Sequence, residues 1–143
     1  MAETTTTEKT ISIQQMRYLQ MMEKKKLRQL SQRMRMTQRL LNENTVVKES
    51  LAELGKGTKD AIIPLGAGVY ASGSITANSF KRTLPGNIVL PASMEEVKKE
   101  LEAREKVYTH DMTQLEKEMQ GTVQNVNSMT ALLQMSKKKA KKE

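Results

Sequence analysis

Two long segments of this chain alternate apolar and polar residues with the spacing of helices, and a short segment between them does not. All three prolines and six of the seven glycines lie between Gly55 and Pro91. The flanks, residues 11–54 and 93–136, are rich in Glu, Lys, Arg, Gln, Leu and Met, which lose little rotamer freedom in a helix. The pattern therefore predicts a mainly α protein with a small β region between two helices.

The apolar residues of both flanks recur at steps of three and four, which is the heptad pattern of a coiled coil. The second flank keeps this spacing from Leu101 to Leu133, and Met94 and Lys98 extend the frame upstream. The seam of the first flank consists of Leu27, Leu30, Met34, Leu41, Asn44 and Leu51. Because a short connection joins neighbouring helices antiparallel, we expect a long two-helix coiled coil with both chain ends at its far end, the tip.

Two β-hairpins fit the middle segment. Residues 61–63 and 69–71 are short runs of strand type, and residues 80–84 and 88–90 flank the turn sequence Pro85-Gly86-Asn87. Isolated hairpins are marginal in water and present open edges, so we expect assembly with strands of other subunits. The alternative is a single small sheet folded back on the helices. The residues assigned to subunit assembly are Ile62, Ile63, Leu65, Gly66, Gly68, Val69, Tyr70, Ile75, Ile88, Val89 and Leu90.

Composition favours an elongated protein over a thick globular core, since only 37% of the residues are hydrophobic and 3% are aromatic. No stretch approaches the roughly 18 consecutive apolar residues of a membrane span. The segment from Met1 to Thr10 lacks the apolar run of a secretion signal. We therefore expect a cytoplasmic location without membrane contact.

The sequence offers no catalytic site. The chain has no cysteine, and its one histidine, His110, has no second histidine at metal-ligand spacing. The glycine-rich run from Pro64 to Gly68 lacks the Gly-Lys-Ser/Thr of a phosphate loop, so a bulge or tight corner in a strand is the expected role. We expect no enzyme activity, no metal and no cofactor.

The net charge of +8 comes largely from two lysine-rich clusters near the expected tip. Such a surface would attract nucleic acid or acidic protein surfaces, with an affinity that falls as salt rises. The alternative is that the lysines only keep the tip in solution. This basic patch consists of Lys24, Lys25, Lys26, Lys137, Lys138, Lys139, Lys141 and Lys142.

One run gives the chain a family resemblance. The sequence from Ile63 to Tyr70 reads Ile-Pro-Leu-Gly-Ala-Gly-Val-Tyr, and Met94-Glu95-Glu96-Val97 opens the second helix. This run and its position between two long helices resemble the alpha subunit of archaeal-type prefoldin. The resemblance covers essentially the whole chain. Two hairpins, against one in beta-type subunits, favour the alpha class. The expected segments are a flexible N-terminal segment 1–10, a single prefoldin-like domain 11–139 with helix 11–54, hairpins 60–92 and helix 93–136, and a basic C-terminal tail 137–143.

The resemblance implies an ATP-independent holdase without enzyme activity. Two alpha and four beta subunits would join through their hairpins into a β-barrel platform, from which six coiled coils project. Their tips would capture non-native client proteins and deliver them to a group II chaperonin. The alternative is a basic prefoldin-like coiled-coil module that binds nucleic acid or a ribonucleoprotein particle, and the salt dependence of binding separates the two.

The expected client-binding residues are apolar residues near the tip, where unbranched, polarizable methionine suits irregular partners. Adjacent residues such as Met21 and Met22 point in different directions, so at least one lies outside a narrow seam. For Met34, Met112 and Met119, filling the seam is an equally good interpretation. The client-binding tip consists of Met16, Leu19, Met21, Met22, Leu27, Met129, Leu132, Leu133 and Met135.

Overall fold

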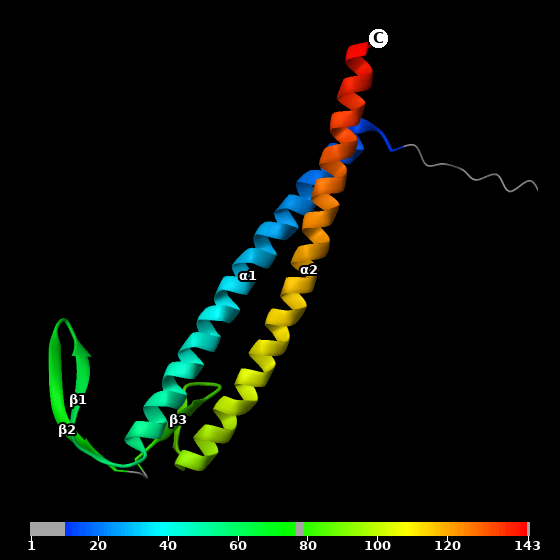
Figure 1. Ribbon diagram of the computed structural model, residues 1–143. Helices are drawn as coiled ribbons and strands as arrows, with labels where there is room; N and C mark the ends of the chain where they lie inside the picture. The colour runs from blue at the N-terminus through cyan, green and yellow to red at the C-terminus, as the bar shows by residue number, and fades with distance from the viewer. Residues whose placement is uncertain (1–10, 77–78, 143) are drawn as a thin grey trace, which may run out of the picture. The chain divides into compact units, whose positions relative to one another are not determined.

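The fold consists of two long helices with two small antiparallel strand pairs between them (Figure 1), as the sequence predicted. The structure is a computed structural model and describes residues 11–76 and 79–142. The segment 1–10, expected to be flexible, lies outside the described residues. The elements are α1 (Ile13–Leu54), β1 (Thr58–Gly66), β2 (Val69–Ile75), β3 (Lys81–Leu84), β4 (Ile88–Pro91) and α2 (Met94–Lys142).

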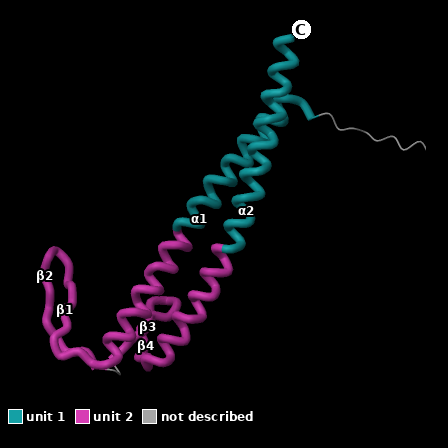
Figure 2. Tube along the Cα trace, viewed as in Figure 1, with its two compact units in different colours: residues 1–35, 113–143 teal, residues 36–112 magenta. Residues whose placement is uncertain are grey.

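The chain divides into two compact units (Figure 2). The terminal unit consists of residues 1–35 and 113–143, and the hairpin unit consists of residues 36–112. Within each unit, a segment of α1 lies beside an antiparallel segment of α2. In the terminal unit the Gln20 amide donates a hydrogen bond to Thr130 Oγ1 over 2.7 Å.

Both helices begin with a capping box, in which a serine and a residue three positions later satisfy each other's backbone N–H groups. At the start of α1, the Gln15 N–H donates to Ser12 Oγ and the Ser12 N–H donates to Gln15 Oε1. At the start of α2, Ser93 and Glu96 make the same pair of bonds, at 3.2 and 3.4 Å. The residues of these two capping boxes thus determine where α1 and α2 begin.

Replacement of Ser93 by Ala should lower the free energy of unfolding by about 1 kcal/mol, because the first turn of α2 loses its side-chain acceptor. Ser50→Ala is the matched control, since Ser50 is exposed inside α1 and its hydroxyl donates only to the Val46 carbonyl. There, alanine should be neutral or slightly stabilising. Urea unfolding followed by circular dichroism measures both variants. Equal effects of the two replacements would show that the box does not stabilise α2.

The buried and half-buried positions of α1 confirm the predicted heptads. In the terminal unit they include Met16, Gln20, Glu23, Leu27, Leu30 and Met34, which face Leu115, Met119, Thr122, Val126, Met129 and Leu133 of α2. In the hairpin unit they include Thr37, Leu41, Asn44, Lys48 and Leu51, which face Val97, Leu101, Glu105, Tyr108 and Met112.

The first turns of α2 differ from the predicted frame. Lys98, placed in the seam by the heptad count, is exposed, and Val97 is half-buried instead. Burial of a lysine ammonium without a partner is costly, whereas Val97 offers an apolar side chain one position earlier. The seam therefore takes two consecutive four-residue steps, from Val97 to Leu101 and on to Glu105.

Three polar residues within the seam of the hairpin unit, Asn44, Lys48 and Glu105, have partners on the facing helix. Asn44 is buried, and its side-chain amide donates to the Leu101 carbonyl over 2.9 Å. Lys48 Nζ lies 2.6 Å from Glu105 Oε2, and this hydrogen bond raises the pKa of Lys48. The seam of this unit thus combines apolar packing with directional contacts that define how its helix segments face each other.

The two hairpins form separate two-stranded sheets, not the single small sheet of the alternative. β1 pairs with β2 through a register that ends at Gly66 and Val69, and the turn residues Ala67 and Gly68 take positive φ values of 50° and 77°. This is the tight hairpin corner predicted for the glycine-rich run, and the backbone twist of such a turn suits the flanking strands. β3 and β4 pair in regular register from Lys81 opposite Pro91 to Leu84 opposite Ile88.

The second helix continues through the lysine-rich residues that the sequence analysis assigned to a tail. α2 ends at Lys142, and residues 137–142 are helical. Lysine and alanine are good helix formers, and Lys139, Lys141 and Lys142 lie in the last turn, where positive charge is stabilised by the helix dipole.

Candidate functional site

The hairpins leave most of their apolar side chains in solvent. Side chains directly opposite each other share a face of the sheet, and one face of β1–β2 pairs Ile62 with Ser72 and Pro64 with Tyr70. Ile62 is 71% exposed and Tyr70 is 64% exposed. Of the residues assigned to assembly, those with exposed large side chains are Ile62, Ile63, Leu65, Val69, Tyr70, Ile88, Val89 and Leu90.

The other residues assigned to assembly lie at the hairpin corner or are partly buried. Gly66 and Gly68 form the β1–β2 corner with positive φ values, and Ile75 is half-buried at the end of β2. On the opposite face of this hairpin Ala61 is buried, and Ile63 approaches Gly73. Ile63 and Val69 are nevertheless exposed on this face, so the hairpin presents apolar side chains on both faces, the kind of surface that further strands can cover.

The nine residues assigned to the client-binding tip all lie in the terminal unit, in two kinds of position. Leu133 is buried in the seam with 9% exposure, and Met16, Leu27 and Met129 are half-buried there. The exposed members are Leu19, Met21, Met22, Leu132 and Met135. These five residues are therefore the members of the predicted client-binding tip that are open to solvent.

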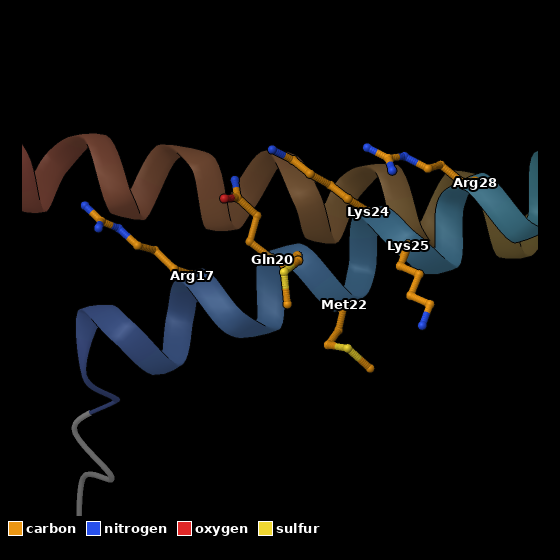
Figure 3. A pocket seen from close by; sticks show the side chains of 7 residues that line it. Arg17, Gln20, Met22, Lys24, Lys25 and Arg28 are labelled. Atoms are coloured by element: carbon orange, nitrogen blue, oxygen red, sulfur yellow. The ribbon is translucent and has the colours of Figure 1, made fainter.

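Met21 and Met22 line an open groove on α1 (Figure 3). The groove has a volume of about 570 Å³, and its lining residues all come from this one helix. Arg17, Gln20, Lys24 and Arg28 project to one side of the helix, whereas Met22 and Lys25 project to the other. The surface therefore combines two flexible thioethers with four cations.

The structure adds residues to this surface that the sequence analysis did not assign to it. Arg17 lines the groove together with Lys24 and Arg28, which belong to the first basic cluster of the sequence. Ile11, Ile13 and Tyr18 are exposed apolar residues of the same unit. Spacing could have found Arg17, because Arg17, Lys24 and Arg28 are seven and four residues apart and so share a helix face. Ile11, Ile13 and Tyr18 carry no such signal.

The charge of the protein is divided unevenly between the two units. The described residues of the terminal unit include thirteen lysines and arginines and three carboxylates, Glu23, Glu116 and Glu118, which gives +10. The described residues of the hairpin unit include ten of each sign and are neutral. All residues of the basic patch are exposed.

Ion pairing follows the same division. The four ion pairs between described residues all lie in the hairpin unit, among them Arg82 with Glu100 and Arg104 with Glu100. Among the residues that the structure describes, no carboxylate forms an ion pair with the cations around the groove. They present their full charge to solvent and to ligands.

The histidine singled out in the sequence does not lie in a cluster of metal-ligating residues within the described ranges. His110 is exposed on α2. No group of three or more His, Cys, Asp or Glu residues within 11–76 and 79–142 could hold a metal ion. Neither long helix contains, within these ranges, an apolar stretch that could span a lipid bilayer.

A comparison with models of protein families gives a match over most of the chain. The family model described as prefoldin subunit matches residues 24–139, which include most of both helices and both hairpins. No curated protein matches the chain at a significant level.

Proposed function

The chain belongs to the prefoldin family, a family of non-enzymatic chaperones, and on this premise we propose that it is an alpha-type subunit of a hetero-hexameric holdase. In this role it joins four beta subunits and a second alpha subunit in the cytoplasm. The complex captures non-native proteins without ATP and delivers them to a group II chaperonin. The observation that carries the proposal is the open groove at Met21 and Met22.

The groove suits a client without fixed structure. Both methionines are exposed, and methionine adapts its three rotatable bonds to irregular partners. Leu132 and Met135 add exposed apolar side chains on α2 in the same unit. A surface of flexible apolar side chains on a helical support can bind many sequences, because it requires no single complementary shape.

The exposed strands of the two hairpins support the same proposal. Exposed strands with residues such as Ile62, Val69 and Val89 would be covered when strands of other subunits pair with them in a closed barrel. The alpha assignment rests on the two hairpins, since beta-type subunits carry one. Barrel closure would remove the open edges that both two-stranded sheets have in a single chain.

The proposed function is tested by diluting a chemically unfolded protein into buffer with the purified complex and recording light scattering. The complex should suppress aggregation without ATP, and suppression should persist at high salt because apolar contacts are not screened. Undiminished aggregation at every ratio of complex to client would contradict a holdase role.

A second candidate follows from the charge of +10 on the described terminal unit. A basic coiled-coil module could bind nucleic acid or a ribonucleoprotein particle through phosphate contacts, which do not require base-stacking aromatic residues. Its affinity would fall steeply as salt rises. Holding of unfolded protein at high salt therefore favours the chaperone, and salt-sensitive binding of RNA or DNA alone favours this second function.

A further inference from the structure

The groove at Met21 and Met22 carries charges of one sign. Its lining residues include Arg17, Lys24 and Arg28 on one side and Lys25 on the other, and they include no carboxylate. Glu23, the nearest carboxylate in the sequence, lies at a half-buried seam position, and its Oε2 atom is buried there. The cations of the groove are therefore not neutralised by this residue.

From this arrangement we propose that the terminal unit selects client segments in which apolar side chains alternate with aspartate or glutamate, and that it disfavours segments rich in lysine or arginine. This inference rests on the proposed holdase function and names the class of client. The two thioethers contact the apolar side chains of the client, and the flanking cations pair with its carboxylates. Charge complementarity of this kind discriminates between partners and accelerates their encounter.

The charge of the whole unit acts in the same direction as the groove. The described terminal unit carries +10, whereas the described hairpin unit is neutral. A field of one sign raises the local concentration of oppositely charged chains and repels chains of the same sign. At physiological salt this field extends about 8 Å, so the selection acts on segments that approach the terminal unit.

An acidic polypeptide fits these residues better than a nucleic acid does. Proteins that bind single-stranded nucleic acid commonly stack its bases on aromatic side chains. Across residues 11–35 and 113–142, Tyr18 is the only aromatic residue. A phosphate backbone would use the cations and leave Met21 and Met22 without a partner, whereas an acidic apolar peptide uses both.

The test compares three fluorescent probes on the complex of this chain with its partner subunits. The first probe is an unstructured twenty-residue peptide of leucine, glycine and glutamate, the second replaces each glutamate by lysine, and the third is a twenty-nucleotide uridine RNA. Fluorescence anisotropy should show that the acidic peptide binds at least about tenfold more tightly than the basic peptide at 50 mM salt. This difference in affinity should become smaller at 500 mM salt, because the charges are screened.

The variant that isolates the groove is Lys24→Glu, Lys25→Glu, Arg28→Glu, in which three exposed cations change sign. It should remove most of the preference for the acidic peptide, because the described terminal unit falls from +10 to +4 (ten cations and six carboxylates). The matched control is Lys98→Glu, Lys99→Glu, Lys106→Glu in the hairpin unit, where the same changes at exposed positions of α2 should leave the preference unchanged.

Each other outcome overturns the inference in a distinguishable way. Equal affinity for the two peptides would mean that the holdase binds clients without selecting their charge. Tighter binding of the RNA, with displacement of the acidic peptide, would assign the cationic surface to nucleic acid. Failure of the complex to bind either peptide would contradict the proposed holdase function itself.

Discussion

The substitution Val69→Asp should break the complex into separate subunits, because it places a carboxylate on a strand that the proposed assembly buries. Val69 begins β2 next to the hairpin corner and is 55% exposed in the single chain. A charge buried without a partner costs several kcal/mol, and each 1.4 kcal/mol weakens association about tenfold. Association should therefore weaken by roughly a thousandfold or more. Sedimentation velocity at micromolar concentration measures the result.

Val107→Asp is the matched control for this experiment. Val107 lies on α2 in the same unit and is 57% exposed, so both substitutions make the same chemical change at positions of nearly equal exposure. The Val107 variant should keep the mass of the complex. If the Val69 variant keeps it as well, the β1–β2 hairpin does not form the subunit interface, and the assembly part of the proposal is wrong.

Replacement of Met21, Met22, Leu132 and Met135 together by serine should abolish most client holding while the mass of the complex stays unchanged. All four side chains are exposed, so their loss should not open the seam. Full burial of one such side chain contributes about 1.5–3 kcal/mol. Partial burial of four against a client therefore predicts at least about a hundredfold loss of affinity. Titration of an unfolded client against the complex, with light scattering as the readout, measures this loss.

The control moves the same kind of change to the hairpin unit. Met36, Leu40, Val46 and Val107 are exposed helical residues of that unit, and their replacement by serine removes a comparable amount of apolar surface. This control variant should hold clients as well as the unchanged protein does. Equal losses in both variants would mean that clients bind along the whole helical surface, and a change in mass of the first variant would assign its four residues to assembly.

The fold could be predicted because its main signals are local. Heptad spacing defined the seam from Leu27 to Leu51, and the concentration of proline and glycine defined the hairpins. The choice between Val97 and Lys98 could not be made this way, since it depends on the cost of burying a lysine where the helix begins. The extension of α2 to Lys142 was missed because a lysine run reads as a solvated tail, although lysine favours helices.

The candidate site could be predicted in part. The argument that adjacent methionines cannot share one seam applies to Met21 and Met22, which are both exposed. It separates Leu132 from Leu133 in the same way, since the first is exposed and the second is buried. Spacing alone did not make this second distinction, because Leu133 satisfies the heptad and also lies near the end of the chain. The client role of these residues stays a prediction.

Native mass spectrometry of the chain, isolated with its bound partners at moderate salt, tests the central claim most directly. The proposed assembly predicts one complex with two copies of this chain and four copies of a smaller coiled-coil subunit. A monomer or homo-oligomer that carries nucleic acid would contradict the chaperone function, and the cationic terminal unit would then be the functional surface.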